Sequence, residues 1–205
     1  MKHRILFLLV LVASFTGQVA FLSATEWHPI FEDTFDREMI GPGWHVLRGD
    51  WRIEDGKLRV TRIWPSDNNI LCTRTMPRGD MRAVIVLRLD NVNYSSIRIG
   101  LRIGEQGWGG GGYPDFFQAR LHVSPDKKPL SLEENGVINI AFEKTYTVEM
   151  TILDNKGTIT IDGKTVVKDC ALPIERSEVN RQFYMNCMPN GWVHSVKLYS
   201  RRGAA

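Results

Sequence analysis

Residues 81–90 read Met-Arg-Ala-Val-Ile-Val-Leu-Arg-Leu-Asp, and an apolar residue occupies every second position of this stretch. One face would carry Met81, Ala83, Ile85, Leu87 and Leu89, and the other Arg82, Arg88 and Asp90 with two valines. A period of two is typical of a β-strand that is buried on one face. Residues 96–103 and 146–152 alternate in the same way, so several such strands are expected.

Turn residues separate these strands. Asp55-Gly56 lies between residues 51–53 and 57–60, and Asp162-Gly163 lies between residues 158–161 and 164–167. Both pairs suit two-residue hairpin turns, whose central residues need positive φ. A further turn is expected at Asn155-Lys156-Gly157. Because no long segment has helical periodicity, the sequence predicts an all-β chain folded as a two-sheet antiparallel sandwich in one domain.

The overall charge argues against one class of partner. The chain has 205 residues, with 26 Lys and Arg against 23 Asp and Glu, which gives a net charge of +3. A nucleic-acid-binding domain usually carries a stronger basic excess. We therefore expect no nucleic-acid partner.

The first 24 residues resemble an export signal. Lys2 and Arg4 precede the apolar run 5–12, and small residues follow, with Ala24 or Ala20 as the cleavage position. The alternative is an uncleaved membrane anchor, but polar residues at 16–18 interrupt the run before the roughly 20 residues that a spanning helix needs. The sequence predicts a signal peptide over 1–24, a domain over 25–205 with no membrane span, and a secreted or periplasmic location.

Three cysteines, Cys72, Cys170 and Cys187, remain in the exported chain. An odd number leaves at least one thiol outside any intrachain disulfide. A bridge between Cys170 and Cys187 and the absence of any bridge are both open. The spacing of these cysteines fits no zinc site.

The chain also resembles a known fold family. Phe31-Glu-Asp-Thr-Phe-Asp36 followed by Gly43-Trp44, the stretch Gly49–Leu58, and the late segments 146–150, 159–164 and 196–199 resemble concanavalin A-like jelly rolls. Laminin-G-like and glucanase-like sandwiches belong to this group, as do the 3-keto-disaccharide hydrolase domains of exported bacterial proteins. The resemblance implies a jelly roll with one curved sheet that binds sugars. It does not fix the activity, because one fold hosts many functions.

Catalytic carboxylates of the laminarinase type are not visible in the sequence. Such enzymes place two or more acidic residues on one face of a strand, as in Glu-x-Asp-x-Glu, which brings them to about 5 Å as retaining hydrolysis requires. Glu133 and Glu134 are adjacent and would point to opposite faces of a strand. The catalytic residues are therefore unknown, and whether the chain is an enzyme is open.

Acidic residues in the opening segment are the candidate metal ligands. Glu32, Asp33 and Asp36 could help to hold a structural Ca²⁺, which prefers oxygen ligands. The alternative is a solvated acidic turn. No other cofactor is indicated.

A polar face is expected on two strands. In residues 116–123, Phe117, Ala119, Leu121 and Val123 would point into the core, which leaves Gln118, Arg120 and His122 on the opposite face. Arg98 and Arg102 lie likewise on the non-core face of residues 96–103. Arginine offers paired donors for carboxylate, sulfate or sugar hydroxyls. An ordinary solvent-exposed face is the alternative interpretation.

A glycine-rich loop joins these two strands. Residues 104–115 contain four consecutive glycines flanked by Trp108 and Tyr113, whose rings could stack on sugars or pack at the edge of the core. Together these features favour an exported domain that binds carbohydrate outside the cytoplasm. Two alternatives remain: a sugar-processing hydrolase like the 3-keto-disaccharide hydrolases, and a non-catalytic sandwich that serves structure or interaction.

Overall fold

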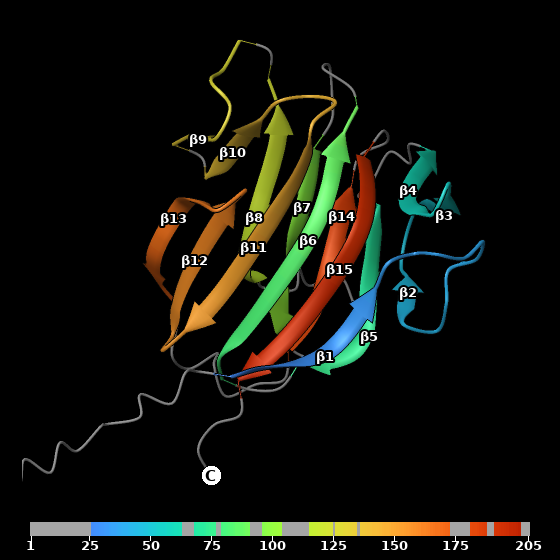
Figure 1. Ribbon diagram of the computed structural model, residues 1–205, viewed down its shortest axis with the longest axis horizontal. Helices are drawn as coiled ribbons and strands as arrows, with labels where there is room; N and C mark the ends of the chain where they lie inside the picture. Colours follow the sequence, from blue (N-terminus) through green and yellow to red (C-terminus); the bar gives the residue numbers. More distant parts are fainter. Residues whose placement is uncertain are drawn as a thin grey trace, which may run out of the picture.

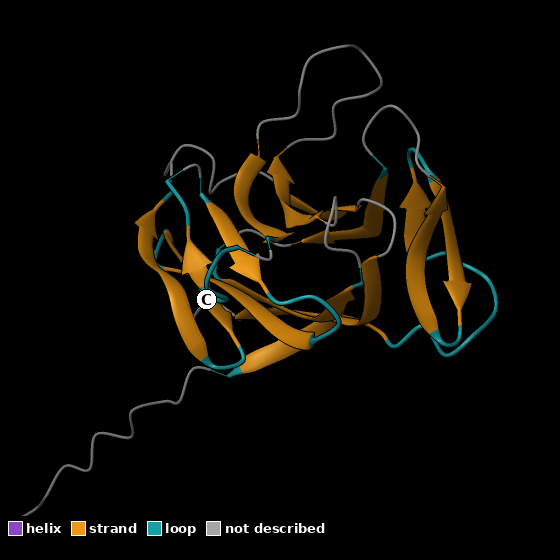
Figure 2. Cartoon of the chain, turned by 90° about the horizontal axis from the view of Figure 1, so that it is seen from above, coloured by secondary structure: helices purple, strands orange, loops and turns teal. Residues whose placement is uncertain are grey.

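Two β-sheets stacked face to face form the protein (Figures 1 and 2). The computed structural model describes residues 26–62, 68–76, 79–90, 96–103, 115–124, 126–134, 136–172, 181–187 and 191–201. These residues form strands and turns and contain no helix. The expected all-β sandwich is confirmed. Within the same ranges, no helix is long and apolar enough to cross a membrane. Residues 1–24, the expected signal peptide, lie outside the described ranges.

One sheet has eight strands and lies in front in Figure 1. Its order is β13 (Lys164–Ala171), β12 (Lys156–Ile161), β11 (Thr145–Leu153), β6 (Met81–Leu89), β15 (Gly191–Arg201), β4 (Lys57–Arg62) and β3 (Asp50–Glu54), and β1 (Trp27–Asp33) also pairs with β15. All pairs in this sheet are antiparallel.

The other sheet has seven strands. Its order is β2 (Trp44–Val46), β5 (Asn69–Met76), β14 (Arg181–Cys187), β7 (Ser96–Ile103), β8 (Asp115–Val123), β10 (Val137–Ile140) and β9 (Ser131–Leu132). The pair β8 and β10 is parallel, whereas the other pairs of this sheet are antiparallel as the sequence predicts. The reason is the connection between β8 and β10, which is long enough to cross over and to add β9 beyond β10.

The core lies between the sheets and follows from the alternation in the sequence. Every second residue of β6 is buried, from Met81 to Leu89. On the facing sheet, Ile99, Leu121 and Phe183 are also fully buried. Burying a side chain of this size contributes about 1.5–3 kcal/mol to folding. The period of two in the sequence therefore fixes which face of each strand enters the core.

The hairpin turns also follow from local sequence. Asp55 and Gly56 have φ of +50° and +67°, and Asp162 and Gly163 have +48° and +77°. These values fit the two-residue turns that Asp-Gly predicts.

The turn expected at residues 155–157 was misplaced. It consists of Asp154 and Asn155, with φ of +49° and +58°, and β12 begins at Lys156. Gly157 lies within the strand, opposite the ring of Phe117 on the other sheet. A Cβ at position 157 would come within 2.5 Å of that ring. This glycine is required by close packing between the sheets and not by a turn.

The cysteines do not form the bridge that was one of the open alternatives. Cys170 has an exposed free thiol on β13, and Cys72 has a buried free thiol on β5. Burial raises the pKa of the Cys72 thiol to about 11. Neither residue is therefore part of a disulfide in this structure.

Candidate functional site

A continuous line of polar residues crosses the outer face of the seven-stranded sheet. Backbone pairing places four of them side by side on successive strands: Asn69 of β5, Asn186 of β14, Arg98 of β7 and Arg120 of β8. We call these four residues the polar row. Directly paired residues have Cβ atoms about 5 Å apart, so neighbours in the row can contact one ligand.

The neighbouring core residues determine that this row faces outwards. Ile97 and Ile99 flank Arg98 and are buried between the sheets. Ala119 and Leu121 flank Arg120 and are likewise buried between the sheets. Because side chains alternate along a strand, both arginines point away from the core. Each of these two arginines is half-buried.

A buried tyrosine lies beside the polar row. Tyr184 of β14 is fully buried although it points away from the main core, and its hydroxyl lies 3.2 Å from Oε1 of Gln118 on β8. Gly100 of β7 lies between these two residues in register. A Cβ on Gly100 would come within 2.9 Å of the Tyr184 ring, so the absence of a side chain lets the ring cross β7.

His122 lies at one end of this face. It pairs with Ser96 of β7 and with Asn139 of β10. The Asn139 side chain is fully buried, accepts a hydrogen bond from the Ser124 amide at 2.9 Å and donates to the Lys128 carbonyl at 3.2 Å. Asn139 thus holds the segment after β8 in place, and His122 is left half-buried beside it.

Four of the five strand residues predicted for the site have side chains on one face. Arg98, Gln118, Arg120 and His122 are placed as described above. The backbone of Arg102 pairs with Gln182 and Asp115, and its side chain lies outside the described residues. The two loop aromatics, Trp108 and Tyr113, lie outside the described residues.

Three residues of this face were missed by the sequence analysis: Asn69, Tyr184 and Asn186. The signal was present in residues 181–187, because Phe183 and Met185 alternate with Tyr184 and Asn186. Only the pairing of β14 with β7 shows that these polar residues adjoin Arg98.

The charge on this face is not balanced. Neither Arg98 nor Arg120 forms an ion pair with any side chain in the part of the chain that the structure describes. No described side chain that points outwards from β5, β14, β7, β8 or β10 is a carboxylate. The face is therefore basic and rich in hydrogen-bond donors.

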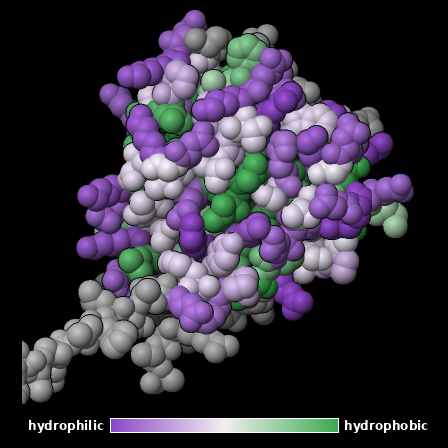
Figure 3. Space-filling model, in the orientation of Figure 1, coloured by the Kyte–Doolittle hydropathy of each residue, from purple (hydrophilic) through white to green (hydrophobic). Residues whose placement is uncertain are grey.

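The outer face of the eight-stranded sheet differs in this respect. Three of the described arginines on β4 and β6 are neutralised by neighbouring carboxylates: Arg59 by Glu54, Arg82 by Glu149 and Arg88 by Asp90. Figure 3 looks onto this side of the molecule and shows a largely hydrophilic surface with a small apolar area near its centre. The paired charges suggest a solvated face and not a binding site for a charged ligand.

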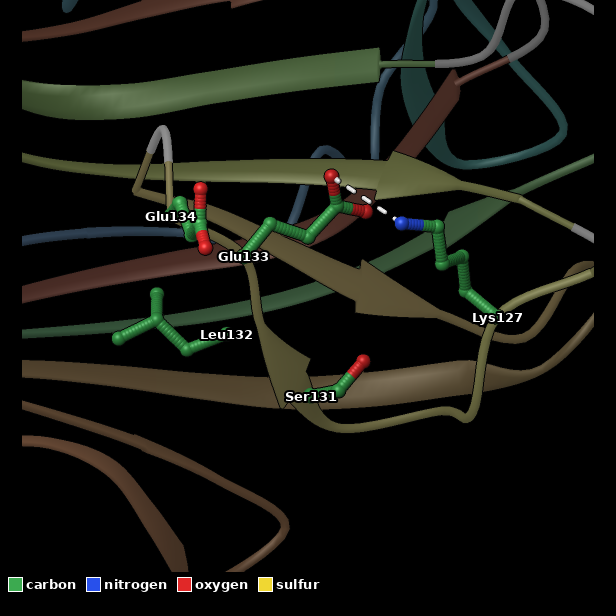
Figure 4. A pocket seen from close by; sticks show the side chains of 5 residues that line it. All are labelled: Lys127, Ser131, Leu132, Glu133 and Glu134. Carbon is green, nitrogen blue, oxygen red and sulfur yellow. Dashed lines mark ion pairs between the residues drawn. The ribbon is translucent and has the colours of Figure 1, made fainter.

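A pocket of about 510 Å³ lies next to β9 (Figure 4). Glu133 extends towards Lys127, and the Nζ and Oε2 atoms are 3.8 Å apart, whereas Glu134 points away from this pair. The Ser131 hydroxyl donates to the Lys128 carbonyl at 2.6 Å. Lys127 and Glu133 pair with each other, and the two carboxylates of the pocket do not face each other as a catalytic pair would.

The three predicted metal ligands form no ligand cluster. Asp33 is buried and accepts hydrogen bonds from both Arg37 Nη atoms, from Trp44 Nε1 and from the Phe35 amide. Glu32 pairs with Lys197 at 2.6 Å, and Asp36 accepts a hydrogen bond from Thr34. Nowhere in the described ranges do three or more His, Cys, Asp or Glu side chains gather as a metal site would require.

The pKa of Asp33 reflects this environment. Burial alone would raise it, but the hydrogen bonds from Arg37, Trp44 and Phe35 outweigh burial and hold the pKa below its usual value. Asp33 is thus an ionised structural group at the junction of the two sheets.

Comparison with known proteins identifies the fold. No protein-family model matches the sequence, and no curated protein sequence matches it either. Solved structures do match. The carbohydrate recognition domain of Emp47p superposes with a TM-score of 0.60 at 11% identity, over 87% of this chain and 99% of that one.

Two further structures are similar. The laminarinase from Rhodothermus marinus has a TM-score of 0.59 at 12% identity and covers 87% of this chain and 99% of its own. The potassium-bound carbohydrate recognition domain of Emp46p has a TM-score of 0.56 at 11% identity, over 87% and 100%. That domain also has a metal-free form. The chain therefore has the concanavalin A-like jelly-roll fold that its sequence resembles.

Proposed function

We propose that this protein binds carbohydrate on the outer face of its seven-stranded sheet. The observation that carries the proposal is the polar row together with Gln118 and Tyr184. The arginine, asparagine and glutamine side chains present guanidinium and amide groups in fixed positions on a rigid sheet, and such groups hydrogen-bond sugar hydroxyls. The buried Tyr184 hydroxyl donates to Gln118 and so helps to hold its amide in position. The likeness to a carbohydrate recognition domain and to a laminarinase supports the same class of ligand.

The loop aromatics belong to this proposal. Trp108 and Tyr113 lie in the segment that joins β7 to β8, the two strands that carry Arg98 and Arg120. Aromatic rings have an apolar face and a polar edge, which suits them to stacking on sugar rings. We assign them a stacking role beside the hydrogen-bonding strands.

Binding fits the face better than hydrolysis. Most glycoside hydrolases use two carboxylates on either side of the scissile bond. The described side chains of this face offer none, and the carboxylates beside β9 point apart. A hydrolase remains the second candidate because of the laminarinase likeness, and product formation in the assay below would favour it.

A glycan array with the full-length protein tests the proposal. We expect saturable binding to at least one glycan, weakened by Arg120→Ala and by Gln118→Ala. The matched control is Lys168→Ala, which removes one exposed positive charge from β13 on the other sheet. No binding above background, or equal losses in all three variants, would refute the proposed site.

Export is a second element of the proposal. It is supported by the basic start, the apolar run and the small residues of positions 1–24. Expression in a secreting host followed by N-terminal sequencing tests it. A mature chain that begins after Ala24 or Ala20 is expected, and an intact Met1 in a membrane fraction would show an anchor instead.

The calcium expectation receives little support from the arrangement of its residues. An ion at Asp33 would compete with the Arg37 guanidinium, whose nitrogens lie 2.6 Å from both carboxylate oxygens. The Emp46p domain shows that a protein of this fold can hold a cation. Comparing the Tm with Ca²⁺ and with EDTA tests the expectation: a rise with Ca²⁺ would show that the folded protein binds the ion, and an unchanged Tm would count against it.

A further inference from the structure

Two arginines oppose each other on the face proposed to bind carbohydrate. Arg98 and Arg120 are direct partners across the antiparallel pair of β7 and β8, and both side chains point outwards. Like charges at directly opposed positions of a sheet repel each other and destabilise the pair. Both residues are half-buried, so water screens this repulsion incompletely.

Half-buried arginines on the eight-stranded sheet have a different environment. Where arginines lie half-buried on the eight-stranded sheet, a carboxylate accompanies them: Glu54 for Arg59, Glu149 for Arg82 and Asp80 for Arg201. Among the described side chains, only the outer face of the seven-stranded sheet leaves two adjacent half-buried arginines without an anion. Folding does not explain this arrangement, because a neutral pair would fold better.

A buried donor beside them points to the same missing partner. Asn186 is the direct partner of Arg98 on β14 and is 7% exposed. Its Nδ2 group is buried and has no hydrogen-bond acceptor among the described atoms. An unsatisfied buried donor is costly and calls for an acceptor. This observation is independent of the charges on the arginines.

We infer that Arg98, Arg120 and Asn186 form an anion-binding subsite, and that the carbohydrate recognised on this face is acidic. This inference rests on the proposed function. A carboxylate or sulfate group of the glycan would lie over the polar row. It would accept paired hydrogen bonds from the guanidinium groups and a further hydrogen bond from the Asn186 Nδ2 group. Its negative charge would relieve the repulsion between the two arginines. Uronate and sulfate ester share this chemistry.

Matched pairs of acidic and neutral glycans test the inference on the wild-type protein. One arm compares an oligogalacturonate with its methyl ester, and the other compares a sulfated galactan oligosaccharide with its desulfated form. Calorimetry is expected to show affinity on the order of tenfold higher for the charged member of at least one pair. The preference should shrink as salt increases, because exposed charge pairs are screened.

Variants locate the effect. Arg98→Gln and Arg120→Gln should each abolish the acidic preference while weaker binding of the neutral form persists, and Asn186→Leu should reduce it. Lys168→Gln is the control for net charge and should leave the preference intact. Because the wild-type comparison needs no variant, a misfolded variant leaves the test decisive.

The outcomes distinguish a failure of the anion subsite from a failure of carbohydrate binding. Equal affinity for charged and neutral members would overturn the anion subsite and leave carbohydrate binding in place. A preference that survives both arginine variants would also overturn it. Failure of every acidic and neutral glycan to bind would refute the proposed function itself.

Discussion

The indole nitrogen of Trp44 donates a hydrogen bond to Oδ2 of Asp33 at 2.6 Å, and this contact joins the two sheets. Asp33 ends β1 of the eight-stranded sheet, and Trp44 begins β2 of the seven-stranded sheet. The Trp44 ring also packs against Phe31 and Phe183, one from each sheet. Asp33, which the sequence predicted as a metal ligand because of its charge, is thus a structural link between the two sheets.

The Asp33 network is expected to contribute strongly to stability. Asp33→Ala would leave the Trp44 indole and the Phe35 amide without their acceptor and would leave Arg37 unpaired. A loss of about 3 kcal/mol in the free energy of unfolding is expected. Urea denaturation measures it. The control Asp36→Ala changes an exposed carboxylate and should cost less than about 0.5 kcal/mol. Equal losses in the two variants would contradict this role.

The same carboxylate should make stability sensitive to acid. Its pKa is lower in the folded protein than the ordinary aspartate value of about 3.9, so the charged form is favoured by folding. The contribution is therefore present above that value and lost as the pH falls through the lower, folded pKa. Unfolding free energies measured from pH 5 downwards should fall less steeply in Asp33→Asn than in the wild type. Parallel curves would show that another group is responsible.

His194 on β15 should produce a separate dependence near neutral pH. Burial lowers its pKa, and the nearby Lys57 and Arg88 lower it further, whereas Asp90 opposes them. The unfolded chain therefore takes up this proton first as the pH falls below the ordinary histidine value of about 6.5, and stability drops. His194→Gln should flatten the stability profile between pH 7.5 and 5.5. Replacing the exposed His45 with Gln is the control and should leave the slope unchanged.

Gly157 should be intolerant of any side chain. Its position opposite Phe117 leaves no space for a Cβ, and overpacking a tight core costs about 1–3 kcal/mol. Gly157→Ala is expected to lower the free energy of unfolding by this amount. The second substitution Phe117→Leu removes the nearest ring atoms, and the double variant should recover part of the loss. Additive losses would place the strain elsewhere.

The two described thiols should differ in reactivity. Cys170 is exposed, whereas Cys72 is buried and its pKa is raised to about 11. Since the thiolate is the reactive form, a thiol reagent at pH 8 should modify Cys170 in the native protein and Cys72 only after unfolding. Mass spectrometry of the labelled peptides measures both. Rapid native labelling at Cys72 would contradict its burial.

Much of the fold could be predicted from local patterns. The alternation in residues 81–90 gave the buried face of β6, because a strand exposes successive side chains to opposite sides. Asp55-Gly56 and Asp162-Gly163 gave two hairpins, because their positive φ values are local properties. The turn at 154–155 was misplaced because Gly157 was taken for a turn residue. Its actual cause, the Phe117 ring, belongs to a distant part of the chain.

The sequence by itself determined the strand faces, the all-β class and the outward direction of Arg98, Gln118, Arg120 and His122. Only the tertiary structure decided that β14 lies between β5 and β7 and so brings Asn186 beside Arg98. It also decided that Asp33 meets Trp44 across the two sheets. The physical reason is range: side-chain direction follows from neighbouring residues, whereas strand order and cross-sheet contacts depend on how the whole core packs.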